Sequence, residues 1–347
     1  MIRVKVATDA EVGIAVRGGL IPWADMLPET FKTLRPDSSN GEFTTNVQTC
    51  CAYYLDYLNE AIYNVYHSAL PEFNKKYEAK GEVVLSALHK VNKSLYRKFG
   101  TPQSTMSGCN PSRHINSNAE YAEVFDGMSY EEVLFKYGSP MGTHLHVDIS
   151  AAQAKSFGLV VDEKWRIQTE QFDNAKLSES IKKIITLAMI PTMYIMRKSG
   201  DDDAIIQRFK LLPLGYFRVK KYGIEFKDFP STILRTPWYA AAAMMALRTA
   251  VYFVSVGNTL KINTDEAYTK LMQLDHDYIA KAFSAMVDHS FLRVDSSLST
   301  EGSWKKLSAV APKSTDVDWE WKRHFSEAGE YRNEHELGLE SCAWKVK

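Results

Sequence analysis

Hydrophobic and polar residues alternate along the start of the chain. Ile2, Val4 and Val6 are separated by single charged residues, and this period of two predicts a β-strand. After a short interruption the alternation resumes over residues 11–16. One face of that second segment is apolar, and the other carries small residues and one carboxylate, Glu11. We therefore expect two short strands here.

The same alternation returns in the middle of the chain. Leu145 and Val147 would face one side of a strand, while His144 and His146 would face the other. Further along, two apolar-alternating runs flank a Tyr-Gly pair that is typical of a turn. Strands are accordingly expected over residues 141–150, 216–220 and 224–228, the last two joined at Tyr222 and Gly223.

Helical spacing accounts for most of the remaining hydrophobic residues. Apolar residues three and four apart predict amphipathic helices. Thr236 followed by Pro237 is a helix start, with Thr as the cap and Pro in the first turn. Helices are expected around residues 55–65, 83–99, 178–196 with a kink at Pro191, from 237 onward, and 265–287.

Strands and helices are mixed without regular alternation, and the chain shows no repeat and no clear interdomain linker. This mixture favours an α+β fold with an antiparallel sheet over a doubly wound fold. We expect one catalytic domain over residues 1–295. Residues 296–347 form a polar tail that keeps four tryptophans, which indicates an ordered extension docked on that domain.

Composition narrows the functional classes. The 42 basic and 42 acidic side chains cancel, which disfavours broad binding to a nucleic-acid backbone. Cys50, Cys51, Cys109 and Cys342 form no CxxC pair, so a reducing, cytoplasmic setting is expected. Residues 238–247, the most apolar stretch, are too short to span a bilayer. No secretory signal is recognisable at the start, and a soluble protein without membrane partners is expected.

Side chains with catalytic or ligating chemistry lie on the polar sides of the predicted strands. Two imidazoles and a carboxylate share one side of residues 142–148, which suits a divalent metal or a phosphate. An exposed polar sheet face has the same pattern. In the hairpin, Glu225 and Lys227 share a face, with Arg218 and Lys220 just upstream. Taken alone, that pattern favours an exposed cross-strand ion pair.

Acidic residues near the start extend the pattern. Asp9 with Glu11, and Asp37 with Glu42, mean little singly. Together with Glu225 and the histidines, they indicate that several strands each place an acid or an imidazole on one sheet face. Oxygen ligands with an imidazole suit Mg²⁺ or Mn²⁺ better than a structural zinc.

The order of these short motifs resembles that of a known family. The motifs are Asp9-Ala10-Glu11, Asp37 with Glu42-Phe43, Gly108-Cys109-Asn110-Pro111, Gly142-Thr143-His144-Leu145-His146-Val147, and Gly215-Tyr216-Phe217-Arg218 with Tyr222-Gly223-Ile224-Glu225-Phe226-Lys227. In this order they resemble the bacteriophage carboxylate–amine ligases of the phiEco32-like type 2 group, within the glutamine synthetase and glutamate–cysteine ligase superfamily. The resemblance covers roughly residues 8–239. Lys227 stands where the family usually has Arg, and Thr143 and Asp148 stand where it has Gly.

The resemblance implies a fold and a site. The antiparallel sheet would curve into a funnel with helices on its outer face, and ATP would enter one end together with Mg²⁺ or Mn²⁺. The implied metal ligands are Glu11, Glu42, His144, His146 and Glu225. The nucleotide would contact Arg208, Arg218, Lys227 and His146, and the catalytic residues would be Arg218, Lys227 and Glu225.

We therefore expect an ATP-dependent carbon–nitrogen ligase that joins a small-molecule or peptide carboxylate to an amine through an acyl phosphate. It would act in the cytoplasm, that of the host if a phage encodes it. Two alternatives stand beside it: a catalytically degenerate relative used for binding or assembly, and a metal-dependent hydrolase using the same acids and histidines. The sequence leaves the two substrates and homo-oligomerisation open.

Overall fold

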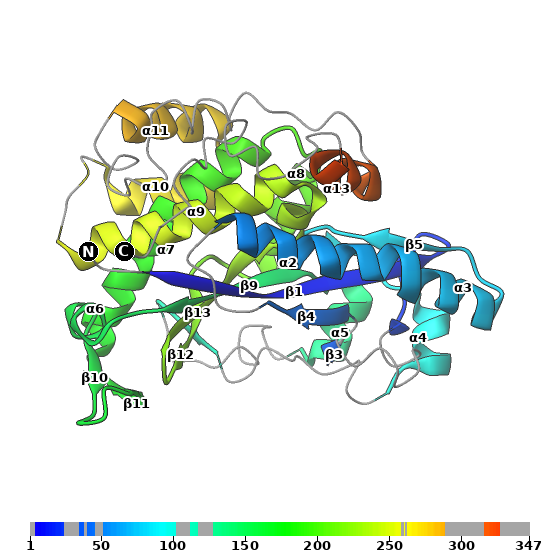
Figure 1. The fold of residues 1–347 in the computed structure, drawn as a ribbon, viewed down its shortest axis with the longest axis horizontal. Coiled ribbons are helices and arrows are strands. Elements are labelled where there is room, and N and C mark those ends of the chain that lie inside the picture. Colours follow the sequence, from blue (N-terminus) through cyan, green and yellow to red (C-terminus); the bar gives the residue numbers. More distant parts are fainter. Residues whose placement is uncertain are drawn as a thin grey trace.

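A computed structural model describes residues 4–23, 35–37, 40–45, 51–101, 112–116, 128–257, 260, 262–288 and 316–326. Within them the fold is α+β, with one large antiparallel sheet and helices packed against it (Figure 1). The strands are β1 (Lys5–Val16), β2 (Gly19–Leu20), β3 (Arg35–Asp37), β4 (Asn40–Thr44), β5 (Gly81–Val84), β6 (Leu88–His89), β7 (Arg113–His114), β8 (Ser139–Pro140), β9 (Gly142–Asp148), β10 (Leu159–Val161), β11 (Ile167–Phe172), β12 (Tyr216–Lys220) and β13 (Gly223–Pro230).

The helices come mostly after β4 and in the second half of the chain. They are α2 (Cys51–Asn64), the π-helical turn η1 (Val65–Ala69), α3 (Leu70–Tyr77), α4 (Lys93–Phe99), α5 (Tyr130–Lys136), α6 (Ala151–Ser156), α7 (Asn174–Met196), α8 (Asp202–Leu211), the 3-10 turn η4 (Ser231–Arg235), α9 (Pro237–Ser255), α10 (Thr264–Met272), α11 (His276–Asp288) and α13 (Val317–Ser326).

The large sheet is built around β1. Its strand order is β3-β4-β1-β9-β13-β12-β7, and β2 and β5 also pair with β1. The described pairings in this sheet are antiparallel. The α+β class and the antiparallel sheet expected from the sequence are therefore confirmed.

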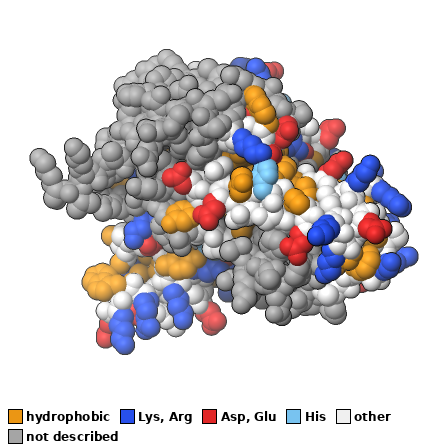
Figure 2. All heavy atoms as spheres, turned by 45° about the vertical axis from the view of Figure 1, so that its right-hand side comes forward, with side chains coloured by type: hydrophobic (Ala, Val, Ile, Leu, Met, Phe, Trp, Pro, Cys, Tyr) orange, Lys and Arg blue, Asp and Glu red, His pale blue; other side chains and the backbone are white. Residues whose placement is uncertain are grey.

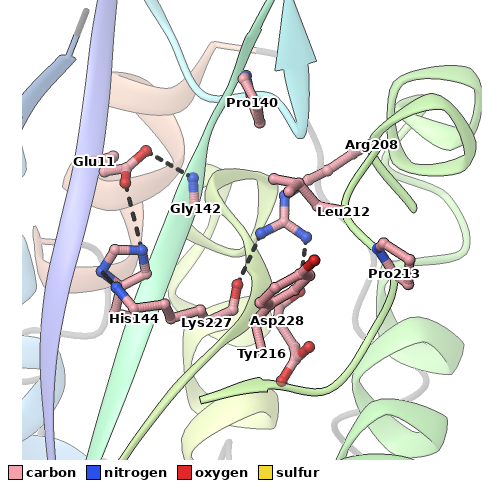
Figure 3. Close-up of a pocket in the computed structure, with 10 residues that line it drawn as sticks. All are labelled: Glu11, Pro140, Gly142, His144, Arg208, Leu212, Pro213, Tyr216, Lys227 and Asp228. Atoms are coloured by element: carbon pink, nitrogen blue, oxygen red, sulfur yellow. Dashed lines mark hydrogen bonds and ion pairs between the residues drawn. The ribbon is translucent and has the colours of Figure 1, made fainter. Parts of the chain in front are cut away.

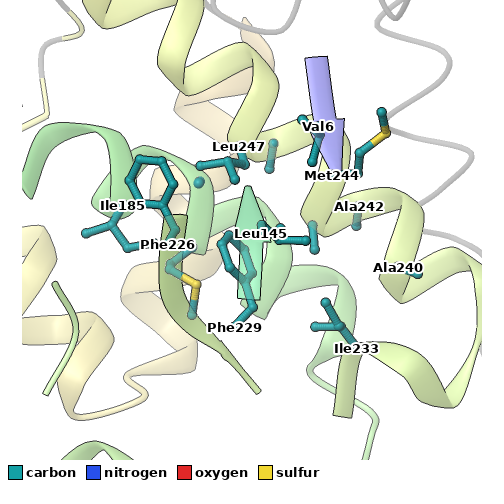
Figure 4. Close-up of a cluster of buried hydrophobic side chains, with 14 of the residues drawn as sticks. Val6, Leu145, Ile185, Phe226, Phe229, Ile233, Ala240, Ala242, Met244 and Leu247 are labelled. Atoms are coloured by element: carbon teal, nitrogen blue, oxygen red, sulfur yellow. The ribbon is translucent and has the colours of Figure 1, made fainter. Parts of the chain in front are cut away.

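One face of the sheet carries the hydrophobic core, against α7 and α9. Figure 4 shows strand residues and helix residues gathered there, among them Val6, Leu145, Phe226, Ile185 and Leu247. The apolar face exists because most alternate residues of β1, β9 and β13 are hydrophobic and successive side chains in a strand point to opposite sides. Helix α9 is buried nearly all round, as its Ala- and Met-rich sequence predicts.

The prediction of two separate strands at the start is wrong, because β1 is continuous from Lys5 to Val16. Residues 8–10 pair with β9 on one side, and Asp9 and Ala10 pair with β4 on the other. Thr8 and Ala10 continue the buried face across the expected break. Two neighbouring strands thus hold this segment extended.

Two expected helices are also corrected. Residues 83–99 form the end of β5, then β6, then α4, whose cap is Asn92. β5 pairs with β1, so a strand partner overrides the helical spacing there. Residues 265–287 divide into α10 and α11, because Leu274 takes a left-handed backbone conformation with φ of 51°.

Other predicted elements are confirmed. β9, β12 and β13 lie where alternation placed them, and α7 covers residues 178–196 with Pro191 inside it. Thr236 caps α9 through its hydroxyl, which accepts from the Tyr239 amide at 3.3 Å.

Of the tail beyond residue 296, the structure describes residues 316–326. Helix α13 contacts α2 and α9, and Trp321 is 1% exposed and donates its indole N–H to the Leu234 carbonyl at 2.8 Å. No helix among the described residues is long and apolar enough to cross a lipid bilayer. Basic and acidic side chains are interspersed over the described part of the surface in Figure 2, in keeping with the zero net charge.

Candidate functional site

The face of the sheet opposite the core helices carries the acids, imidazoles and bases that the sequence singled out. Directly paired residues on neighbouring antiparallel strands share a face. The pairs on this face are Glu11 with Glu42, Asp9 with His144, His146 with Glu225, and Glu225 with Arg218. Residues far apart in the sequence are thus brought together by strand register.

His144 lies between the two buried glutamates of this face. Its Nε2 is 3.5 Å from Glu11 Oε1, and its Nδ1 is 3.6 Å from Glu225 Oε1. Glu11 is fixed through its other oxygen, which accepts from the Gly142 amide at 2.9 Å and from Asn40 Nδ2 at 3.2 Å. These three side chains form the centre of the face.

Three cations surround Glu225. The nearest are Lys227 at 2.7 Å and Lys220 at 2.8 Å, and Arg218 follows at 3.5 Å. Burial alone would raise the pKa of Glu225, but the charges of Lys227 and Arg218 lower it far below its usual range. Glu225 is therefore a carboxylate with more positive than negative charge around it.

His144 is a neutral imidazole. Its burial lowers its pKa well below the usual value, and the neighbouring Lys227 ammonium lowers it further. The Lys227 ammonium lies 3.5 Å from Nδ1, so that nitrogen acts as the acceptor. The ring proton is then on Nε2, facing Glu11.

His146 uses both ring nitrogens on other partners. Nε2 is 2.7 Å from Asp9 Oδ2, and Nδ1 is 2.5 Å from the Tyr222 hydroxyl. Burial raises the pKa of Asp9, yet the hydrogen bond and charge of His146 outweigh burial and leave it lowered. Of the two histidines, His144 is the one that lies beside the glutamates.

A β-bulge brings a residue to this face that alternation does not predict. The register between β13 and β9 shifts between Phe226 and Phe229, so Lys227 and Asp228 both lie opposite His144. Bulges re-aim side chains in this way and are frequent beside functional sites. By strict alternation, Asp228 belongs with the apolar Ile224 and Phe226, and sequence reasoning therefore missed it.

The bulge is held by Arg208 of α8. Its guanidinium donates to the carbonyls of Lys227 at 2.8 Å and Asp228 at 3.1 Å (Figure 3). Asp228 itself accepts from the Gly215 amide at 2.5 Å, and burial raises its pKa to about 7. Arg208 was predicted to contact nucleotide; in this structure its two terminal nitrogens donate to these backbone carbonyls.

A small cleft opens between these residues (Figure 3). Its lining comprises Glu11, Pro140, Gly142, His144, Arg208, Leu212, Pro213, Tyr216, Lys227 and Asp228. The cavity volume is about 20 Å³, which is room for about one water molecule. A larger ligand would require the side chains that line it to move.

The donor types of the centre fit a divalent cation. Glu11 and Glu225 are oxygen ligands and His144 is a nitrogen ligand, a set found at Mg²⁺ and Mn²⁺ sites. In the arrangement described, no group of three or more His, Cys, Asp or Glu among the described residues stands ready to hold a metal ion. The Lys227 ammonium lies beside Glu225 and His144, so a cation would bind there only after Lys227 moves.

The remaining predicted residues lie at the margins. Glu42 is partly buried on β4, opposite Glu11, and Asp37 lies in β3. Asp148 pairs with Lys5 at 3.3 Å near the surface, away from the centre. The motif at residues 108–111 lies outside the described residues.

Comparison of the chain with family models, curated proteins and solved structures finds no match. The arrangement of the charged face is therefore the basis for a functional assignment.

Proposed function

We propose that this chain is an ATP-dependent carboxylate–amine ligase with a glutamine synthetase-like catalytic domain. One observation carries the proposal. The motif residues Glu11, His144, Glu225, Arg218 and Lys227 come from four strands and meet on one face of an antiparallel sheet. Their order along the chain is the order that resembles the ligase family.

The charge around Glu225 suits a polyphosphate. Arg218, Lys220 and Lys227 stand within 3.5 Å of a single carboxylate. Such a site attracts an anion, and phosphate oxygens would give these cations new partners. Arg218 and Lys220 are less buried than Lys227, so they would meet the incoming phosphates first.

Glu11, His144 and Glu225 would hold a divalent cation once phosphate draws Lys227 away from Glu225. A bound Mg²⁺ or Mn²⁺ neutralises charge on the phosphates during transfer. The protein's own cations would stabilise the same developing charge from the other side, as Arg218 and Lys227 are placed to do.

The reaction has two steps. The substrate carboxylate attacks the γ-phosphorus of ATP, which forms an acyl phosphate and releases ADP. An amine then attacks the acyl carbon, a C–N bond forms, and phosphate leaves. The first step supplies the activation that a carboxylate lacks on its own.

The test is ADP release from ATP with Mg²⁺ and a panel of amino acids, peptides and amines. Glu225→Gln is expected to lower the rate by about 100-fold or more, because it removes a carboxylate ligand of the cation that would neutralise the transferred phosphate, and such electrostatic stabilisation is worth that much. Glu82→Gln is the matched control, since Glu82 is an exposed strand glutamate on β5. Equal rates in wild type and Glu225→Gln would disprove the site assignment.

A binding or assembly protein is the second candidate function. Two observations favour it: Glu225 is already paired with three cations, and the cleft beside it has a volume of only about 20 Å³. Calorimetry with ATP and Mg²⁺ separates the two. Heat of binding supports the ligase, and its absence at millimolar ligand supports the alternative.

A further inference from the structure

A second cavity, larger than the cleft of the charged face, lies at the end of β1, where α3, β5 and α4 come together (Figure 1). Its volume is about 550 Å³, which is within the range of small-molecule sites in proteins. Val16 lines it and is five positions beyond Glu11 in the sequence, which corresponds to about 17 Å along an extended strand. The cavity is therefore separate from the charged face.

Three aromatic rings form one wall of this cavity. Phe73 and Tyr77 lie one turn apart on α3 with ring centroids 5.2 Å apart, and the Tyr77 ring meets that of Phe99 on α4 edge-on at 5.7 Å. Aromatic pairs favour such contacts. Phe73 is 2% exposed, whereas Tyr77 and Phe99 are only partly buried. This aromatic wall thus spans two helices and offers ring surface to a ligand.

Hydrogen bonds join the elements around the cavity. The side chain of Asn92 donates to the Val16 carbonyl at 3.2 Å, and its backbone amide donates to the Leu20 carbonyl at 2.7 Å. Both bonds tie the start of α4 to β1 and β2. The Gly81 amide donates to Asn74 Oδ1 at 2.7 Å, which ties β5 to α3. The cavity therefore has the connected walls of a site formed before its ligand arrives.

Three basic side chains line the same space, namely Arg17, Lys80 and Lys98. Glu78 is the acid of the described lining, so three positive charges stand against one negative charge. Among the described residues, none of the three cations forms an ion pair with a carboxylate. The cations around Glu225 on the charged face, by contrast, are paired with it. An anion entering this cavity would have no carboxylate to displace and would be attracted by the excess charge.

Arg17 occupies a backbone conformation that its residue type disfavours. It lies in the turn between β1 and β2 with φ of 54°, beside Gly18 with φ of 73°. Turns of this kind usually take Asn, Asp or Gly there. Glu78, at the end of α3, also has a positive φ, of 47°. Two of the four non-glycine residues with positive φ among the described residues thus line this one cavity, and such residues cluster at ligand sites.

We propose that this cavity binds a small aromatic anion. The ring system of the ligand would lie against the aromatic wall, and its anionic group would meet Arg17, Lys80 and Lys98. Lys98 already lies over the Phe99 ring at 4.9 Å, so a single ligand of modest size reaches both kinds of contact. A carboxylate, a sulfonate and a phosphate all offer the oxygen acceptors that these donors need. The site does not depend on the proposed ligase reaction.

Fluorescence titration of the full chain with anilinonaphthalene sulfonate tests the proposal. Arg17→Asn removes the guanidinium and introduces a residue that accepts the left-handed conformation. The dissociation constant of the sulfonate should rise about tenfold, the value of one charge-assisted contact. The thermal midpoint should not fall, so lost binding would not reflect unfolding. N-phenylnaphthylamine has the same rings without the sulfonate, and its affinity should change by less than about threefold.

Two further variants separate the cations from the rings. Lys98→Gln should act as Arg17→Asn does, on the sulfonate alone. Phe99→Leu should weaken both dyes by about fivefold, because both use the aromatic wall. Lys155→Gln is the matched control, since Lys155 is an exposed lysine on α6, a helix that does not line the cavity, and both dyes should bind it as they bind wild type.

Competition against the bound sulfonate identifies the anion. Naphthoate and naphthyl phosphate carry the same rings, and the stronger competitor shows whether the site favours a carboxylate or a phosphate. Displacement by neither would overturn the proposal. An unchanged sulfonate affinity in both Arg17→Asn and Lys98→Gln would overturn it too, as would equal weakening of the charged and the neutral dye by these two variants. The ligase assay measures a different site, so either proposal can fail while the other stands.

Discussion

The two faces of the central sheet are made by the same strands but carry different kinds of buried side chain. On the helix face, Leu145 and Phe226 are fully buried among other hydrophobic side chains. On the opposite face, their neighbours His144 and Glu225 are almost as buried, at 4% and 2% exposed, but they are polar or charged. Burial is similar and the chemistry is reversed.

The difference indicates that the apolar face stabilises the fold, whereas the charged face does so much less. Buried apolar area stabilises the fold roughly in proportion to its size. A buried charge pair is weak evidence for stability, because removing two charges from water costs several kcal/mol. The charged face is therefore the region on which the proposed function rests.

The largest change in the free energy of unfolding is expected from a substitution on the face that packs against the helices. Phe226→Ala should lower the free energy of unfolding by about 3–5 kcal/mol, because it leaves a cavity in a fully packed core. Urea denaturation measures the change, and Val160→Ala, at a side chain 43% exposed on β10, is the control expected to be near neutral. A loss below about 1 kcal/mol would mean that this face is loosely packed.

A smaller change in the free energy of unfolding is expected from a substitution on the charged face. Glu225→Gln should cost about 3 kcal/mol, because Lys227 is left buried without its carboxylate. The double variant Glu225→Gln with Lys227→Met should recover most of that loss in urea denaturation, since no buried charge is then uncompensated. Lys5→Ala removes only the surface pair with Asp148 and should cost about 1 kcal/mol or less. A double variant no more stable than Glu225→Gln would show that the pair itself stabilises the fold.

The smallest expected effect is a pH dependence of stability that comes from Asp228 in the β-bulge. Burial raises the pKa of Asp228 from 3.8 to about 7, so the folded protein keeps a proton there that the unfolded chain has lost. Stability should therefore fall as pH rises through 7, by about 1.4 kcal/mol between pH 6 and 8.

Asp228→Asn should remove that part of the pH dependence, because the amide oxygen still accepts from Gly215 and carries no charge. Thermal unfolding at pH 6 and 8 checks it, with Asp265→Asn, at a side chain 82% exposed, as control. Parallel pH profiles for wild type and Asp228→Asn would contradict the expectation.

Much of the fold was predictable because alternation is a strong local signal. β9, β12 and β13 were placed correctly, and the same period put Glu225 and Lys227 on one face. The helix expected over residues 83–99 failed because pairing with β1, a contact distant in sequence, decides the conformation of β5.

The site was predictable as a face but not as a set of contacts. Residue types two apart identify which side chains share a side, yet they do not say which of two histidines meets the glutamates. The position of Asp228 on the charged face could not be predicted from the sequence, because a bulge depends on how two strands pair. Arg208 was singled out for its charge, whereas its position under the bulge comes from the packing of α8.

Successive residues of each site strand face the core and the charged face in turn, so outside the bulge a shift by a single position would move a site residue to the core face. Asp9 and Glu11, His144 and His146, and Glu225 and Lys227 are each two apart. Sequence divergence can change the residue types and the lengths of the segments between the pairs, but it must keep the spacing of two positions within each pair. A distant relative would then be recognised by three such doublets in this order, separated by intervals of any length.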